Sequence, residues 1–266
     1  MSLKNLRTTV SRVAALEAEI TLLKSRVDCA PGLFDELRTE RNSTAYAERY
    51  SVGHTPLVSI CVATYNRGDL LCERALKSLV QQTYQNIEIV VVGDGCTDDT
   101  ERRVAAIPDS RIRFINLSER GIYPDEAYRR WCVAGTAPLN AALAIASGDF
   151  ITHLDDDDEH SPDRIEKLVR HCQATGAEVV YHPFAFEARD GGWRINNAGT
   201  FAFGRVTTSS IFYDAFYRRI PWDIEAHLLN EPGDWNRLRK FIYLGAKIDR
   251  FPDVLLRHFR ERSQSN

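Results

Sequence analysis

Apolar residues in the middle of the chain form short blocks separated by amphipathic stretches, a pattern typical of alternating strands and helices. Blocks with the composition of strands fall at residues 57–64, 86–92, 111–117, 149–154 and 177–182. Apolar residues with helical spacing lie between them at 69–82, 97–106, 141–146 and 162–174. Because strands that alternate with helices in this way pair in parallel, we predict βαβ units and a mostly parallel sheet.

The two ends of the chain depart from this pattern. Apolar residues recur at heptad positions within residues 1–28, which predicts either an amphipathic helix or a short coiled coil that would form a homo-oligomer. Residues 29–55 are polar and irregular and indicate a linker with one helical turn. Turn residues within 184–210 indicate a hairpin, and a helix at 233–245 and a closing strand at 254–260 are predicted after it.

Four consecutive aspartates, Asp155 to Asp158, follow the apolar block at 149–154. Adjacent carboxylates repel one another, and a divalent cation would relieve that repulsion. Carboxylate oxygens suit Mg²⁺ or Mn²⁺, and ligands of open α/β sheets gather at the carboxyl ends of strands. The alternative is an exposed acidic loop that caps the next helix. An EF-hand loop is excluded because His160 stands where that loop requires glycine.

Composition narrows the class of protein. The 266 residues carry a formal net charge of -3, so the chain lacks the excess of positive charge that is typical of nucleic-acid binding. Six cysteines include no Cys-x-x-Cys pair, which indicates buried thiols in a reducing compartment. We find no signal peptide and no long apolar run, so we expect a cytoplasmic protein, at most peripheral at the inner face of a membrane.

Five motifs in order resemble the family 2 glycosyltransferases of the GT-A fold. They are Val58-Ser59-Ile60 with Thr64-Tyr65-Asn66, the run from Gln82 to Val92, Gly93-Asp94-Gly95-Cys96-Thr97-Asp98, Gly135 with Asn140, and Leu154 to Asp158 followed by Pro162-Asp163-Arg164. The resemblance covers residues 57–260. It implies a Rossmann-like, mostly parallel sheet flanked by helices within a domain at 56–262. Residues 56–158 would bind the nucleotide sugar, and residues 159–262 would bind the acceptor.

The resemblance also assigns the donor site. Residues expected to bind the nucleotide are Thr64, Tyr65, Asn66, Arg67, Asp94, Asn140, Asp155 and Asp156. Among them, Asp94 matches the carboxylate that reads the base, typically from uracil N3–H. A Mn²⁺ or Mg²⁺ ion is expected on Asp157, with Asp155 and His258 as further ligands, where it would neutralise the diphosphate leaving group.

An inverting transfer requires a carboxylate that takes the proton of the acceptor hydroxyl. The family supplies it near the start of a late helix, and the matching segment here is 231–235. We therefore expect Asp234 to be the base and Glu231 to be its reserve. The alternative reading of Asp234 is an acid that only stabilises the helix N-terminus.

The chain departs from the family pattern at two places. Gly93 replaces the first carboxylate of the usual Asp-Asp-Gly-Ser, and Leu139 replaces a common arginine before Asn140. Loss of that arginine removes a diphosphate contact that Arg113, Arg257 or Arg260 would have to supply.

We predict an inverting glycosyltransferase that moves a sugar from a nucleotide-sugar donor, with UDP favoured, to a glycan or lipid-linked acceptor. A sugar-phosphate nucleotidyltransferase would need a glycine-rich basic loop after the first strand, which residues 65–68 match poorly. A non-catalytic domain that binds nucleotide or partners is the other alternative, because of the two departures.

Overall fold

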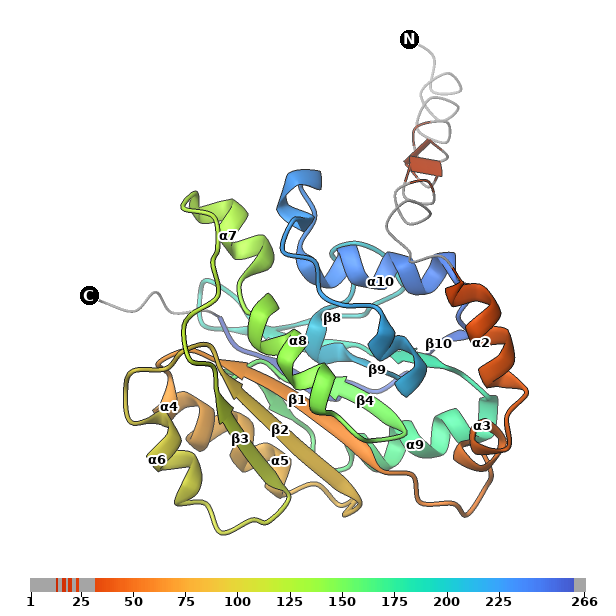
Figure 1. Ribbon diagram of the computed structural model, residues 1–266, viewed down its shortest axis with the longest axis horizontal. Helices are drawn as coiled ribbons and strands as arrows, with labels where there is room; N and C mark the ends of the chain where they lie inside the picture. Colours follow the sequence, from red (N-terminus) through yellow and green to blue (C-terminus); the bar gives the residue numbers. More distant parts are fainter. Residues whose placement is uncertain (1–12, 14–15, 18, 21–22, 24–31, 261–266) are drawn as a thin grey trace.

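The computed structural model describes residues 32–260 and, before them, residues 13, 16, 17, 19, 20 and 23. A seven-stranded sheet in the order β10-β6-β9-β4-β1-β2-β3 runs through the molecule (Figure 1). Its strands are β1 (Val58–Thr64), β2 (Ile87–Gly93), β3 (Ile112–Asn116), β4 (Phe150–His153), β6 (Val179–Tyr181), β9 (Ile211–Asp214) and β10 (Ile248–Arg250). Within this sheet, β9 alone is antiparallel to its neighbours. The prediction of a mostly parallel sheet is therefore confirmed.

Alternation along the strands gives the sheet two apolar faces. In β1, Val58, Ile60 and Val62 belong to one buried cluster and Cys61 belongs to the other. The first cluster is covered by the helix at 68–80 and by α9, and the second by α8 and α10. These helices are α4 (Gly68–Leu70), a π-helical segment (Leu71–Leu76), α5 (Lys77–Val80), α8 (Thr136–Ile145), α9 (Arg164–Thr175) and α10 (Gly233–Tyr243). Helix α6 (Thr100–Ala105) also lies beside the sheet, and its Val104 belongs to the first cluster.

A second, four-stranded sheet has the order β5-β11-β7-β8. Its strands are β5 (Glu159–His160), β7 (Phe184–Glu187), β8 (Trp193–Asn196) and β11 (Leu256–His258). The antiparallel pair β7–β8 is the hairpin predicted within 184–210, and β11 is the predicted closing strand. Because β11 pairs with β5 directly after the acidic run, β11 lies beside the four aspartates.

The prediction of a linker at 29–55 is wrong for most of its length. Helices α2 (Leu33–Arg41) and α3 (Thr44–Arg49) occupy it, and Leu33 and Leu37 are buried in the second core cluster. The side chain of Ser43 caps α3 by accepting a hydrogen bond of 3.1 Å from the Tyr46 amide. Helices this short carry little periodic signal and depend on tertiary contacts, which the local sequence does not reveal.

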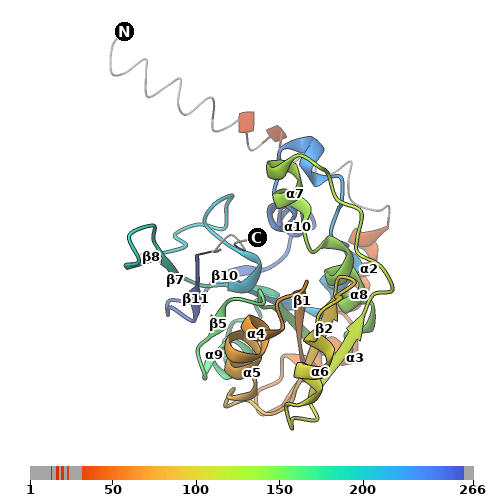
Figure 2. The same ribbon diagram turned by 90° about the vertical axis from the view of Figure 1, so that its left-hand side faces the viewer.

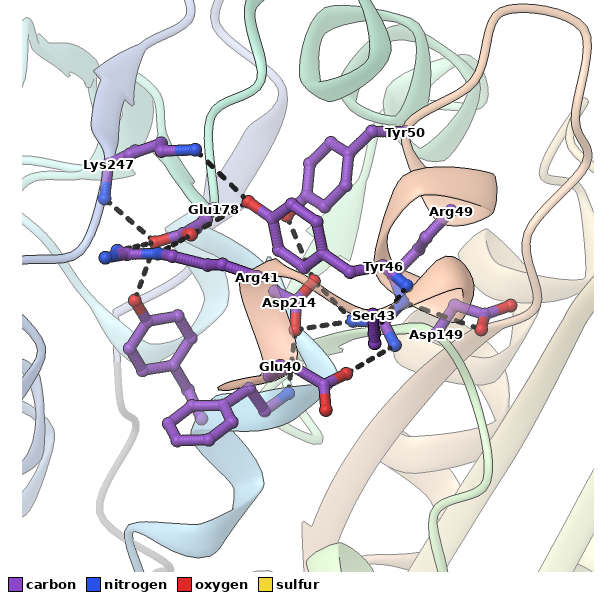
Figure 3. Close-up of polar contacts among 12 residues, drawn as sticks. Glu40, Arg41, Ser43, Tyr46, Arg49, Tyr50, Asp149, Glu178, Asp214 and Lys247 are labelled. Carbon is purple, nitrogen blue, oxygen red and sulfur yellow. Dashed lines mark hydrogen bonds and ion pairs between the residues drawn. The ribbon is translucent and has the colours of Figure 1, made fainter. Parts of the chain in front are cut away.

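Two buried carboxylates hold α2 and α3 to the sheet (Figure 3). Glu178 accepts hydrogen bonds of 2.6 Å from Nε and from the terminal nitrogen of Arg41, and others from the hydroxyls of Tyr46 and Tyr217. Asp214 lies 2.7 Å from the guanidinium of Arg49. Both carboxylates lie at the edge of the sheet opposite the carboxyl ends of β1, β2 and β4, so this network serves stability.

The coiled coil expected at 1–28 falls mainly outside the described residues. Four described positions of its apolar stripe, Val13, Leu16, Ile20 and Leu23, are helical and about half exposed. The choice between an amphipathic helix and a coiled coil stays a prediction. In the part of the chain that the structure describes, no helix combines the length and the apolar character needed to cross a membrane.

Candidate active site

A cleft of about 1220 Å³ opens at the carboxyl ends of β1, β2 and β4. Its walls include most of the residues expected to bind donor or metal, namely Thr64, Tyr65, Arg67, Asp94, Asp155, Asp156, Asp157, Asp234 and His258. They come from segments that are far apart in sequence. The parallel strand ends bring Thr64, Asp94 and the aspartates together, and α10 and β11 supply Asp234 and His258. Three expected residues, Asn66, Asn140 and Glu231, do not line the cleft.

Asp94 lies at the end of β2 with only 3% of its surface exposed. Its carboxylate accepts hydrogen bonds from the Gly121 amide at 2.9 Å and from the Tyr123 hydroxyl at 2.8 Å. Burial first, and then this hydrogen bond, raise the pKa of Tyr123. The guanidinium of Arg120 lies 3.8 Å from the ring centre of Tyr65. Residues Arg120 and Tyr123 thus form part of the wall at the predicted base site, a role that no motif of the sequence analysis indicated.

The second and third aspartates of the acidic run contact the loop after β1. Asp156 accepts hydrogen bonds from the Thr64 hydroxyl at 2.7 Å and from Arg67 at 3.0 Å. The same nitrogen of Arg67 lies 3.2 Å from Asp157. Burial raises the pKa of Asp156 to about 6, and Arg67 opposes that shift. Arg67 therefore offsets part of the negative charge of the run.

The first and fourth aspartates meet His258. One ligand atom from each of Asp155, Asp158 and His258 can be chosen so that all three lie within 4.8 Å of one another. Asp158 Oδ2 lies 2.8 Å from His258 Nδ1, and its other oxygen accepts a hydrogen bond from the Phe259 amide. Burial and the charge of Asp158 raise the pKa of Asp155 to about 8. Burial alone would lower the pKa of His258, but Asp158 outweighs it and raises the pKa to about 9.

This geometry changes the expected metal-ligand set. Asp158, which the sequence analysis did not name as a ligand, groups with Asp155 and His258, whereas Asp157 faces Arg67. A partly buried carboxylate whose pKa is raised by burial and by a second carboxylate fits a site that a cation would neutralise. The oxygen-rich set, with Asp157 also on the cleft wall, fits Mn²⁺ or Mg²⁺.

Asp234 and Glu231 differ sharply in their surroundings. Asp234 lies in the first turn of α10, lines the cleft and accepts a hydrogen bond from the Trp235 amide at 2.6 Å. Burial raises the pKa of Asp234 to about 6, in the range where a carboxylate works as a general base near neutral pH. Glu231 instead accepts hydrogen bonds from Arg239 at 2.9 Å and Asn236 at 3.1 Å. Asp234 therefore lines the cleft, whereas Glu231 bonds to the protein's own side chains, and the assignment of Asp234 as the base stays a prediction.

A model of glycosyl transferase family 2 matches residues 59–130 and 133–226. The chain belongs to this family. One relative of the chain is the Escherichia coli protein named UDP-Glc:alpha-D-GlcNAc-diphosphoundecaprenol beta-1,3-glucosyltransferase WfaP, which is 38% identical over 131 residues. That match covers 49% of this chain and 47% of WfaP. The chain spans less than half the length of the first curated relatives that it matches.

Solved structures of glycosyltransferases share the fold. Staphylococcus aureus TarS 1–349 in complex with UDP-GlcNAc aligns with a TM-score of 0.61 at 19% identity, over 78% of this chain and 60% of that chain. The mannosyltransferase PcManGT of Pyrobaculum calidifontis, in complex with GDP-Man and Mn²⁺, aligns with a TM-score of 0.56 at 17% identity. It covers 88% of this chain and 69% of that chain. The predicted GT-A fold is confirmed.

Within this family 2 member, two asparagines expected at the nucleotide hold the protein's own backbone. The Asn140 amide donates to the carbonyl of Trp222 at 3.0 Å and accepts from its N–H at 2.8 Å. Asn66, at φ 52°, accepts a hydrogen bond from the Thr97 amide at 2.8 Å and so joins the loops after β1 and β2. Neither side chain lines the cleft, and direct contact of either with the nucleotide stays a prediction.

Several arginines are candidates for the diphosphate contact of the family arginine that Leu139 replaces. Arg67, Arg120, Arg130 and Arg260 line the cleft, whereas Arg113 bonds to the Ile145 carbonyl away from it. Arg120 and Arg130 lie in a segment whose chemistry the sequence did not reveal. Of the three arginines expected to compensate, only Arg260 is on the cleft wall.

Proposed function

We propose that this chain carries the catalytic domain of an inverting glycosyltransferase, which moves a sugar from a UDP-sugar to a hydroxyl of a glycan or lipid-linked acceptor. The observation that carries the proposal is the placement of Asp234 in the same cleft as the aspartates of the acidic run. A TarS structure holds UDP-GlcNAc and the name of WfaP describes a UDP-glucose donor, and these relatives favour UDP.

The donor would lie along the strand ends. Thr64 and Tyr65 would hold the ribose and base, and Asp94 would accept a hydrogen bond from the base. Asp155, Asp157, Asp158 and His258 would hold Mn²⁺ or Mg²⁺, as in the PcManGT complex with Mn²⁺. The bound ion would supply Lewis-acid neutralisation of the diphosphate. Arg67, which already faces Asp156 and Asp157, would contribute a fixed positive charge nearby.

Asp234 would perform the proton transfer. Its carboxylate would take the proton of the acceptor hydroxyl while the acceptor oxygen forms a bond to the anomeric carbon. The bond from that carbon to the phosphate oxygen breaks, and its electron pair leaves with the nucleoside diphosphate. Attack from the face opposite the leaving group inverts the anomeric configuration. The raised pKa of Asp234 suits this role, because a base needs some affinity for the proton it accepts.

The acceptor is proposed from the relatives. The name of WfaP describes a diphosphoundecaprenol-linked acceptor, and the Campylobacter jejuni relative named GalNAc(5)-diNAcBac-PP-undecaprenol beta-1,3-glucosyltransferase carries a similar description. A lipid-linked acceptor would bring this chain to a membrane surface as a peripheral protein.

The test is release of nucleoside diphosphate from UDP-glucose, UDP-N-acetylglucosamine and GDP-mannose, with Mn²⁺ and a bacterial polyprenyl-linked lipid extract. We expect turnover with a UDP-sugar, and an Asp234→Asn variant slower by about 10²–10⁴-fold. Proton NMR of the product should show the inverted anomer. A retained anomer would contradict the mechanism, and full activity in Asp234→Asn would remove the proposed base. Glu225→Gln, a change at an exposed carboxylate nine residues before Asp234, is the control.

A further inference from the structure

Three large apolar side chains are exposed beside the cleft mouth, on or next to the β7–β8 hairpin. Trp193 and Ile195 of β8 are 44% and 58% exposed, and Phe203 of the following loop is 57% exposed. The Asn196 side chain contacts the Gly204 carbonyl at 3.4 Å, which joins the loop to the hairpin. We call residues 185–205 with 257–260 the hairpin surface. Figure 2 shows this hairpin projecting from the molecule, well apart from helix α7 (Ala127–Val133).

The hairpin surface has an excess of positive charge. Its exposed arginines are Arg189, Arg194, Arg205, Arg257 and Arg260. The carboxylates on it or beside it are Glu159, Glu187 and Asp190. Five guanidinium groups against three carboxylates leave two positive charges in excess, in a chain whose formal net charge is -3. Such a surface is electrostatically complementary to an anionic layer.

A second group of exposed apolar side chains has the opposite charge. It lies on α7 (Ala127–Val133) and the 3-10 helix η4 (Ala226–Leu229), where Trp131 is 58% and Leu228 is 60% exposed. Residues 125–133 and 223–229 contain four carboxylates and two arginines. The charge on these segments therefore opposes an anionic partner. The two surfaces offer a matched comparison, because both expose apolar groups near the same cleft.

The hairpin surface is also continuous with the cleft. The Trp193 ring lies edge-on to Phe259 with ring centres 5.0 Å apart, and Arg257 lies over Trp193 at 5.5 Å. Phe259, Phe203 and Arg260 line the cleft as well. A lipid held at the hairpin surface would therefore have its head group next to the cleft.

We propose that the hairpin surface docks on an anionic lipid bilayer and thereby faces the cleft toward lipid-linked acceptors. The orientation toward lipid-linked acceptors rests on the proposed function, but membrane docking itself can be measured without catalysis. Tryptophan favours the level of the lipid head groups, and arginine forms bidentate contacts with phosphate. Exposed apolar residues rimmed by arginines combine the two interactions that hold a peripheral protein on a charged membrane.

The test is co-sedimentation of the full chain with vesicles of phosphatidylcholine alone or with about one third phosphatidylglycerol. We expect binding to the anionic vesicles that weakens with added salt. A Trp193→Ala, Ile195→Ser variant should lose most of it, and Arg189→Gln with Arg205→Gln should weaken it by about fivefold or more. Leu228→Ser on η4 is the matched control and should bind like the wild type. Equal loss in the control, or no binding to either vesicle, would overturn the proposal.

A second measurement guards against misfolded variants. Brominated lipids in the anionic vesicles should quench tryptophan fluorescence of the wild type and of Trp131→Phe, and quench Trp193→Phe much less. Equal quenching in both single variants would contradict the assignment. The competing occupant of the hairpin surface is a second copy of the chain that pairs with edge strand β8. A dimer that light scattering detects, that depends on the hairpin and that forms without vesicle binding would overturn the proposal. Nucleotide-induced stabilisation of the hairpin variants reports separately on the proposed function.

Discussion

His258 Nδ1 lies 2.8 Å from Asp158 Oδ2, which ties the last described strand to the acidic loop after β4. The amide of Phe259 donates to the other oxygen of the same carboxylate, so Asp158 is held by two successive residues of one segment. This contact fixes the imidazole beside Asp155. The proposed metal site and strand β11 are thereby joined.

From this contact we predict that His258→Gln weakens metal binding more than it weakens the fold. The Mn²⁺ concentration that half-saturates UDP-dependent stabilisation should rise by roughly tenfold to a hundredfold. The control is His171→Gln, because His171 forms a similar 2.8 Å pair with Asp249 on the surface of α9. An unchanged Mn²⁺ requirement in His258→Gln would remove this residue from the site.

Activity should depend on pH through Asp234. Burial raises the pKa of this carboxyl to about 6, so the base is protonated and inactive below that pH. We expect kcat/KM to fall about tenfold per pH unit below about pH 6, and protonation of Asp234 should have no effect on it well above that pH. Rates measured from pH 4 to 8 test this. A plateau that continues down to pH 4.5 would show that another group accepts the proton.

Glu231 should matter for stability and little for chemistry. It contacts Arg239, whose side chain is fully buried, and loss of a charge from such a pair costs about 3 kcal/mol. Glu231→Gln should therefore lower the free energy of unfolding in urea, while kcat per folded molecule stays close to that of the wild type. A hundredfold loss of kcat in a stably folded variant would reassign the base.

Anchoring of α3 should contribute strongly to stability. Arg49→Met removes the guanidinium 2.7 Å from the buried carboxylate of Asp214, and we expect a loss of about 3–5 kcal/mol in urea unfolding. Arg38→Met removes an exposed pair with Asp35 and should cost less than about 1 kcal/mol. Equal effects of the two changes would show that α3 is not part of the folded core.

The parts of the fold carried by long local patterns could be predicted from the sequence. The buried strands β1 and β2 and the hairpin β7–β8 each have a run of apolar residues or turn residues that is visible without tertiary information. Strand β9 has four residues, Ile211 to Asp214, all buried, and no alternation marks it. Helices α2 and α3 escaped prediction because partners distant in sequence, Glu178 and Asp214, stabilise them.

The candidate active site was also predictable only where local sequence patterns determine it. Residues at strand ends, such as Asp94 and Asp157, lie in the cleft because the parallel sheet puts them there. The grouping of Asp158 with His258 depends on how the turn after β4 directs consecutive side chains, which sequence spacing does not determine. The pairing of Asn140 with the Trp222 backbone, which joins two halves of the domain, is equally invisible in the sequence, and its expected contact with the nucleotide stays a prediction.

The most direct test of the central claim is thermal stability with UDP, GDP or CDP, each with and without Mn²⁺, for the wild type and Asp157→Ala. A nucleotide that binds only the folded state adds about 2.7 kcal/mol at a hundredfold excess over its dissociation constant. We predict stabilisation by UDP that requires Mn²⁺, is lost in Asp157→Ala and persists in the surface control Asp125→Ala. No stabilisation by any of the three nucleotides would contradict the assignment of the cleft as a nucleotide-sugar site.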